Sequence, residues 1–207
     1  MITKDMNEEQ LFFQVDGKKY SIKERDVVSI EREKTIIRIR MSDMAVLELR
    51  SSLAKILREA QSDRLVLCNR STIVNRDYIY AVDPGNRYVI LRNNRGRLDL
   101  GVSYKDRIIK GLAYRADEFL LRLDNIRYVI RVDEFLYAKS SKRVLHIVLR
   151  DGREFLISQK PIRYILQQVG TGKLLHCARG VLVNCEYLEK IDGKNLKLLP
   201  ANGEWVK

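Results

Sequence analysis

The stretch RSTIVN at residues 70–75 returns as RGVLVN at residues 179–184. Both copies consist of an arginine, a small residue, apolar residues and then Val-Asn. They also lead into similar sequels, RDYIYAVD after the first and CEYLEKID after the second. Because chance is a poor explanation for so long a pattern, we interpret the two stretches as corresponding positions of an internal repeat.

The repeat extends over most of the chain. A shift of 108 residues superposes the early parts of the two copies, and after one inserted residue the shift becomes 109. Identical pairs include Asp16 and Asp124, Tyr20 and Tyr128, Cys68 and Cys177, and Tyr78 and Tyr187. A period of this length is that of a domain. We therefore expect an N-terminal tail at 1–10, domains at 11–110 and 119–207, and a linker at 111–118, with the second domain shortened at its C-terminal end.

Each copy has a mostly β pattern. Short apolar runs such as LFFQV, TIIRIRM and LVLC are separated by turn signals that include DG and NNRG. The exception is SSLAKILREA at 51–60, whose apolar residues recur at helical spacing after a serine N-cap. Its counterpart is KPIRYILQQV at 160–169, with Pro161 at the expected first helical position. We predict two β domains with one short helix each, and a further helical turn within 103–112.

The charge of the chain favours a polyanionic partner. Its 39 Lys and Arg residues outnumber 27 Asp and Glu, which gives a formal charge of +12 and a pI near 9.7. Each copy carries half of this excess, so neither is merely a basic tail. Such a balance is typical of proteins that bind nucleic acid or an anionic membrane surface. No stretch approaches the roughly 18 apolar residues of a membrane span, and we expect a cytoplasmic protein without membrane insertion.

No pattern indicates an enzyme, a metal site or a cofactor. The three cysteines, Cys68, Cys177 and Cys185, are an odd number without Cys-x-x-Cys spacing, so we expect reduced thiols rather than a zinc site or a disulfide framework. His146 and His176 lie in apolar strand runs, where an imidazole on a sheet face or in the core is the commoner explanation. No nucleophile or phosphate-binding glycine motif accompanies them.

The arginine that opens each repeated motif is the first candidate contact. Arg70 and Arg179 precede strands whose Ile73 and Leu182 face inward, so each guanidinium should project from a loop at a sheet end. There it can bind a phosphate or make a bidentate contact with guanine. The Val-Asn asparagines, Asn75 and Asn184, are different. They favour a structural role in an Asx turn that ends the strand.

These features resemble a known family. The string LVLCNRSTIVNRDYIYAVD, preceded by VVSIEREKTIIRI and a short amphipathic helix, is similar to the LytTR DNA-binding domain of bacterial transcription regulators. LLHCARGVLVNCEYLEKID resembles the same domain a second time. The resemblance implies a regulator that presents loops to successive major grooves of double-stranded DNA, recognises direct repeats and bends the duplex.

The resemblance also implies three contact segments in each domain. The first is Arg32, Glu33, Lys34 and Thr35 in copy one, and Lys139, Ser140, Ser141, Lys142 and Arg143 in copy two. The second is Asn69, Arg70 and Ser71, and then Ala178, Arg179 and Gly180. The third, in copy one only, is Val102, Ser103, Tyr104 and Lys105. The family commonly has histidine where Asn69 and Ala178 stand, and a basic residue where Tyr104 stands. Asn69 can still hydrogen-bond DNA, whereas Ala178 cannot.

Two other functions fit parts of the pattern. Copy two, with its third segment missing, is a candidate for a self-association surface or for binding a regulatory protein, because edge strands of a shortened domain are open to pairing. RNA binding also fits the charge, but the single Trp205 and the scattered tyrosines are more typical of packing residues than of a base-stacking platform.

Overall fold

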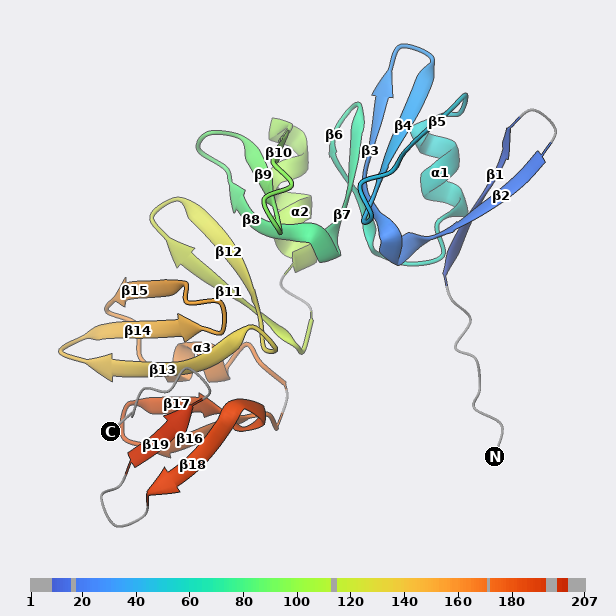
Figure 1. Ribbon diagram of the computed structural model, residues 1–207. Coiled ribbons are helices and arrows are strands. Elements are labelled where there is room, and N and C mark those ends of the chain that lie inside the picture. The colour runs from blue at the N-terminus through green and yellow to red at the C-terminus, as the bar shows by residue number, and fades with distance from the viewer. Residues whose placement is uncertain (1–8, 16–17, 113–114, 171, 193–196, 201–207) are drawn as a thin grey trace, which may run out of the picture. The chain divides into compact units, whose positions relative to one another are not determined.

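The chain divides into two compact units, Met1–Leu112 and Ala113–Lys207. The computed structural model describes residues 9–15, 18–112, 115–170, 172–192 and 197–200 (Figure 1). Trp205 lies outside these ranges. The boundary between the units falls inside the segment 111–118 that the sequence suggests as a linker.

The first unit contains a five-stranded antiparallel sheet, preceded in the chain by a two-stranded hairpin and followed by a three-stranded meander. The sheet has the strand order β5-β4-β3-β7-β6. Its strands are β3 (Val27–Glu33), β4 (Ile36–Met41), β5 (Val46–Leu49), β6 (Leu65–Asn69) and β7 (Thr72–Asn75). The first hairpin pairs β1 (Gln10–Val15) with β2 (Lys18–Lys23), and the meander that follows β7 consists of β8 (Ile79–Asp83), β9 (Tyr88–Leu91) and β10 (Arg97–Asp99). Its helices are α1 (Leu53–Glu59) and α2 (Lys105–Leu112).

The second unit repeats this order. Its sheet runs β15-β14-β13-β17-β16. These strands are β13 (Phe135–Ser141), β14 (Val144–Leu149), β15 (Glu154–Ser158), β16 (Leu174–Ala178) and β17 (Val181–Asn184). The flanking hairpins are β11 (Glu118–Leu123) with β12 (Ile126–Arg131), and β18 (Leu188–Asp192) with β19 (Lys197–Pro200), while α3 (Arg163–Leu166) lies between β15 and β16. The predicted mostly β fold is confirmed.

Buried and exposed side chains alternate along the strands, so the core of the first unit lies on one face of the five-stranded sheet. Along β4, Ile37 and Ile39 are buried and the arginines between and after them are exposed. Leu53 and Ile56 of α1 pack on this buried face together with Leu11 of the first hairpin. Burial of each such side chain contributes about 1.5–3 kcal/mol. The sheet end that carries the β6–β7 loop is thereby held on a packed scaffold.

The helices match the sequence unevenly. Ser52 caps α1 as expected, since its Oγ accepts from the backbone N–H of Lys55 at 3.2 Å. The segment 103–112 forms a 3₁₀ turn and the eight-residue helix α2, more than the single turn predicted. In contrast, α3 is only four residues long, and Pro161 precedes its N-cap Ile162 instead of occupying the first helical position. The turn before α3 is tight, because Tyr164 N–H bonds to the Pro161 carbonyl at 3.0 Å.

A buried asparagine closes β7. Asn75 donates from Nδ2 to the carbonyl oxygens of Glu24 at 3.0 Å and Val27 at 2.8 Å, which lie just before and at the start of β3. Its Oδ1 accepts from the backbone N–H of Asp77 at 3.0 Å, which is the expected Asx turn. The side chain is fully buried, so these bonds satisfy groups that water cannot reach.

Asn184 makes the same three bonds at the end of β17. Its Nδ2 donates to the carbonyls of Val132 at 2.8 Å and Phe135 at 3.1 Å, and its Oδ1 accepts from Glu186 N–H at 3.1 Å. The asparagine of the repeated Val-Asn therefore has the structural role that the sequence favours. It joins the end of β17 to the segment that enters β13, the central strand of the sheet.

We predict that Asn75→Ala lowers the free energy of unfolding by about 2–4 kcal/mol, because it leaves two buried carbonyls without donors. Urea denaturation followed by circular dichroism measures this change. Asn125→Ala, at an exposed position of the β11–β12 turn, is the control and should stay within about 0.5 kcal/mol of the unsubstituted chain. Equal stabilities of the two variants would contradict the anchoring role.

Candidate functional site

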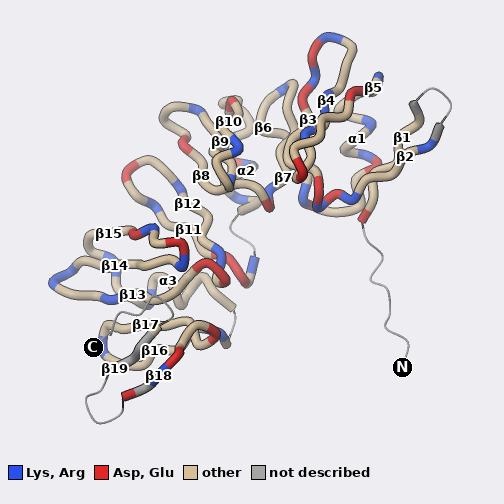
Figure 2. The backbone as a smooth tube through the Cα atoms, viewed as in Figure 1, with Lys and Arg blue, Asp and Glu red and all other residues tan. Residues whose placement is uncertain are grey.

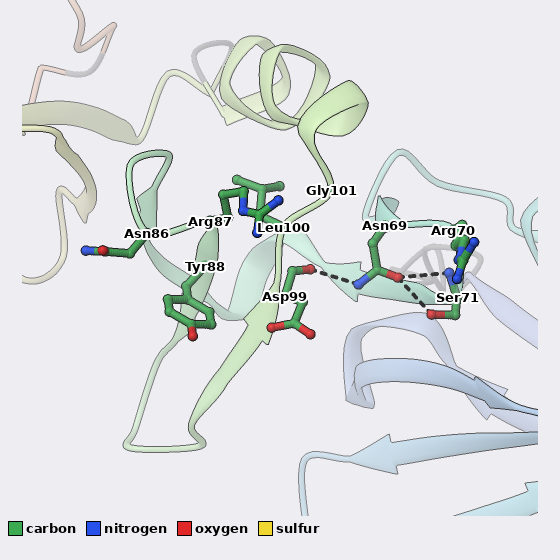
Figure 3. A pocket seen from close by; sticks show the side chains of 9 residues that line it. All are labelled: Asn69, Arg70, Ser71, Asn86, Arg87, Tyr88, Asp99, Leu100 and Gly101. Carbon is green, nitrogen blue, oxygen red and sulfur yellow. Dashed lines mark hydrogen bonds between the residues drawn. The ribbon is translucent and has the colours of Figure 1, made fainter.

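The β6–β7 loop of the first unit is braced by its own asparagine. Asn69 Oδ1 accepts from the backbone N–H of Ser71 at 2.8 Å and from its Oγ at 3.0 Å. Asn69 Nδ2 donates to the carbonyl oxygen of Asp99, at the end of β10, at 2.8 Å (Figure 3). The amide is thus largely used within the unit, which favours a positioning role for Asn69 over the DNA contact suggested by the sequence.

Arg70 stands between these braced residues and is exposed. Among the described residues, no ion pair or hydrogen bond occupies its guanidinium. Arg179, at the matching position before β17, is also exposed and likewise has no side-chain partner within the described ranges. Both guanidinium groups therefore retain all their donors for a ligand.

The first and second expected segments meet at one end of each sheet. β3 runs antiparallel to β7, so the end of β3 lies beside the start of β7. The backbone N–H of Arg32 bonds to the carbonyl of Ser71 at 2.8 Å, and the matching pair, Ser140 N–H and Gly180 carbonyl, lies at 2.7 Å. The same backbone bond joins both segments in each unit.

The first segment is less loop-like than the sequence suggests. Arg32, Lys139 and Ser140 lie within strands, and only a two-residue turn connects each strand pair. In the second unit this turn is Lys142-Arg143, and both residues adopt positive φ, at 48° and 67°. Two consecutive left-handed residues are typical of a type I′ turn, which matches the twist of a tight hairpin.

The acidic residues of the first segment are neutralised in pairs. Glu33 pairs with Arg38 at 2.7 Å, and Glu31 pairs with Arg40 at 2.8 Å. Arg32 and Lys34 are left exposed without ion-pair partners in the described part of the chain. The matching turn in the second unit carries basic residues without acids between them, and Figure 2 shows Lys and Arg at the tip of β13–β14.

The third segment follows β10 and packs against the second. Gly101 N–H bonds to the carbonyl of Cys68 at 2.8 Å. A Cβ on Gly101 would lie 2.8 Å from the Tyr104 ring and 3.4 Å from Asn69 Cα, so glycine permits the close approach. Tyr104 is thereby half-buried against this crossing, while Lys105 begins α2.

Residues 99–101, which we term the strap, hold two walls of an open pocket. The strap bonds to the β6–β7 loop on one side, and Leu100 N–H bonds to the carbonyl of Arg87, in the β8–β9 tip, at 2.8 Å on the other. The pocket between them has a volume of about 370 Å³. Its lining consists of Asn69, Arg70, Ser71, Asn86, Arg87, Tyr88, Asp99, Leu100 and Gly101 (Figure 3). Sequence reasoning missed the tip residues, because nothing in the chain predicts that the tip folds back onto the strap.

The β16–β17 loop of the second unit is built differently. Ala178 replaces the bracing asparagine, and Gly180 adopts a φ of +85°. A Cβ on Gly180 would lie 2.9 Å from the Ser140 carbonyl oxygen, so only glycine fits here. The loop that carries Arg179 therefore depends on backbone conformation, whereas the Arg70 loop depends on side-chain hydrogen bonds.

Cys68 is a buried thiol next to the strap. Its carbonyl accepts from Gly101 N–H, its side chain is fully buried, and its Sγ donates to the Thr72 carbonyl at 3.5 Å. Burial raises the pKa of the Cys68 thiol to about 12, because desolvation disfavours the thiolate. Burial also raises the pKa of Cys177, its half-buried counterpart, whereas Cys185 is exposed.

The two histidines lie on sheet strands. His146 of β14 contacts Glu154 through Nε2 at 2.8 Å, and His176 of β16 is exposed. Among the described residues, no group of three His, Cys, Asp or Glu side chains is placed to hold a metal ion. Within the same ranges, no helix has the length and apolar character needed to cross a bilayer.

Part of the chain matches the model of a known family. Residues 17–111 match the family model of the LytTr DNA-binding domain. Among the solved structures that match is the LytTr DNA-binding domain of a putative methyl-accepting/DNA response regulator from Bacillus cereus, with 18% identity and a TM-score of 0.43. The similarity covers 51% of this chain and 98% of that one. No curated protein matches the chain.

We predict that Asn69→Ala increases the alkylation rate of Cys68 by about fivefold or more, because losing bonds of about 1 kcal/mol each loosens the strap. Labelling with iodoacetamide at pH 8 followed by peptide mass spectrometry measures the rate. Cys177, in the other unit, is the internal control and should react at its original rate. An unchanged Cys68 rate would show that Asn69 does not brace the strap.

Proposed function

From the premise that residues 17–111 form a LytTr DNA-binding domain, we propose that the chain is a sequence-specific, double-stranded DNA-binding transcription regulator of the bacterial cytoplasm. Arg70 and Arg179 read base edges in the major groove. The basic residues beside them, Arg32 and Lys34 in the first unit, hold the phosphate backbone. Lys139, Ser140, Lys142 and Arg143 take the corresponding part in the second unit, and Ser71, Tyr104 and Lys105 complete the first.

The observation that carries this proposal is the convergence around Arg70. Three segments that are far apart in sequence meet at one sheet end, and the guanidinium there has no ion-pair partner among the described residues. A braced loop loses little backbone entropy on binding, and the arginine's planar fork of donors matches O6 and N7 of guanine. Its neighbours Arg32 and Lys34 supply positive charge, and the nearby carboxylates of Glu31 and Glu33 are paired with other arginines.

The second unit supports a bipartite site. The same backbone bond joins its first and second segments, and Arg179 occupies the position of Arg70. Two covalently linked units of the same fold most naturally bind half-sites that are related by translation and spaced by whole turns of the DNA helix, each about 10–10.5 bp. The linkage gives the second unit a high effective concentration, so two weak modules bind tightly together. Bending of the duplex then lets both units engage it.

A different role for the second unit is favoured by the exposure of β16. β16 is the edge of its sheet, and Leu175 is 46% exposed on it. In the first unit, the matching strand β6 is covered by β10 and α2, and its cysteine is fully buried. The second candidate function is therefore self-association through β16. Sedimentation of the full chain without DNA distinguishes self-association from DNA reading by the second unit. A dimer that Leu175→Lys abolishes would favour self-association.

We predict that Arg70→Ala and Arg179→Ala each reduce the preference for the specific site over random DNA by about 1–3 kcal/mol, which is about 5- to 150-fold. Fluorescence anisotropy with both DNAs measures the ratio. Arg58→Ala, on the exposed side of α1, is the charge-matched control and should keep the ratio. An equal loss on every sequence would mean that these arginines contact phosphates alone.

We predict that inserting about 5 bp between the half-sites weakens binding at least tenfold, whereas inserting about 10 bp weakens it less. Half a turn places the second half-site on the opposite face of the duplex, and a whole turn restores its face. Titration of the three DNAs at constant salt measures the effect. Indifference to the 5-bp insertion would show that only one unit reads sequence.

A further inference from the structure

We propose that Arg87, at the β8–β9 tip, forms with Arg70 a binding site for a phosphodiester group of the DNA backbone. This inference rests on the proposed function and deepens it. It assigns a DNA contact to a hairpin tip outside the three segments that the sequence suggests. Arg70 then contributes to base recognition from one wall of the site, while Arg87, on the other wall, binds the DNA backbone.

The strap fixes the spacing between the two arginines. It bonds to Asn69, the neighbour of Arg70, through the Asp99 carbonyl at 2.8 Å. The next residue, Leu100, bonds through its N–H to the carbonyl of Arg87 at 2.8 Å. Consecutive residues of one extended segment therefore hold both walls of the pocket. Such a prearranged pair pays no ordering cost for its backbone when a ligand enters.

The tip itself is rigid. The carboxylate of Asp83 accepts from the backbone N–H groups of Gly85 at 3.1 Å and Asn86 at 3.0 Å, and from Asn86 Nδ2 at 2.8 Å. These bonds hold the pKa of Asp83 below its ordinary value, the backbone bond from Asn86 first among them. Arg87 follows with a φ of 60°, a left-handed conformation that turns the chain back toward the strap. The Asp83 carboxylate is used inside the tip and does not pair with Arg87.

The charge of the pocket favours an anion. Arg70 and Arg87 are both exposed, and neither has an ion pair or a side-chain hydrogen bond in the described part of the chain. A third guanidinium stands beside the lining, because Arg97 lies 4.2 Å from the centre of the Tyr88 ring. Against them is the single carboxylate of Asp99, which Figure 3 shows pointing to the same side as Tyr88. The lining therefore carries net positive charge.

The shape of the pocket favours a group on a chain over an enclosed small molecule. It is open, and most of its rim is polar, with Ser71, Asn86 and the two guanidinium groups. A phosphodiester offers two charged oxygens to such donors, and arginine binds phosphate in a fixed, two-donor geometry. Because Arg70 itself lines the pocket, a DNA strand that it reads passes this pocket.

The test compares Arg87→Gln with the unsubstituted full chain in DNA titrations at several salt concentrations, on specific and on random DNA. Each phosphate contact contributes about 0.9 to the slope of log affinity against log salt. Arg87→Gln should therefore lower the slope by about 0.9 and weaken both DNAs about five- to tenfold at 0.1 M salt. The ratio of specific to random affinity should stay as it was, unlike that of Arg70→Ala.

Three matched variants make the result decisive. Arg87→Lys should retain the slope, and Arg58→Ala should leave it unchanged. Asp99→Asn should strengthen binding to both DNAs, because it removes the opposing charge and leaves the backbone bond to Asn69 in place. A thermal denaturation curve for each variant separates loss of binding from loss of fold.

The outcomes separate this site from the proposed function. If the unsubstituted chain binds no DNA, both fail together, whereas binding without any sequence preference overturns the proposed function and leaves the phosphate site to be judged by the salt slope of Arg87→Gln. If Arg70→Ala abolishes the preference while Arg87→Gln and Asp99→Asn behave like Arg58→Ala, DNA reading stands and the phosphate site is overturned. The phosphate site for DNA is also overturned if inorganic phosphate binds in the pocket at constant ionic strength while Arg87→Gln leaves the DNA affinity unchanged.

Discussion

The structure depends on a buried asparagine at the end of β7 and of β17, the strands beside the central strand of each five-stranded sheet. Asn75 and Asn184 each satisfy two backbone carbonyls at the entrance to the sheet and start the turn after it. Because these bonds help to fix how β7 pairs with β3 and how β17 pairs with β13, they also help to fix which turns meet at the opposite end of each pair. That end carries the loops with Arg70 and Arg179, so the anchor lies at one end of β7 or β17 and the candidate contact lies in the loop before the other end.

The sequence predicts this framework because the repeat exposes it. Identical spacing of Val-Asn in two copies indicates a common strand, and short alternating runs indicate its neighbours; both follow from local chemistry. The length of α2 and the contacts of the strap do not follow from local chemistry. α2 is held by Arg76, which bonds to Asp63 at 2.5 Å and to the Gly111 carbonyl. Such contacts join residues far apart in sequence, and no local pattern encodes them. The role of Asn69 shows the same limit: its chemistry suits a DNA contact, and the fold uses it for bracing.

The two units keep the framework and differ in what stands on it. Where the first has Asn69 and Ser71, the second has Ala178 and a glycine that adopts a positive φ. Where the first has the buried clamp Arg76, the second has the exposed Cys185. These differences all lie around β6 and β16, the edge strands that carry the arginine loops. The two units thus share a backbone framework and differ in the side chains around the arginine loops, which fits our proposal that they read half-sites with unequal strength.

The central claim is that the two sheet ends read DNA together, and selection of bound sites from a random double-stranded pool tests it most directly. The full chain should enrich two short motifs in the same orientation, separated by a nearly constant spacing. The same selection with Arg70→Ala should lose the information of one motif and keep the other. A pool without enrichment, or one enriched in inverted repeats that Arg70→Ala leaves intact, would contradict the account.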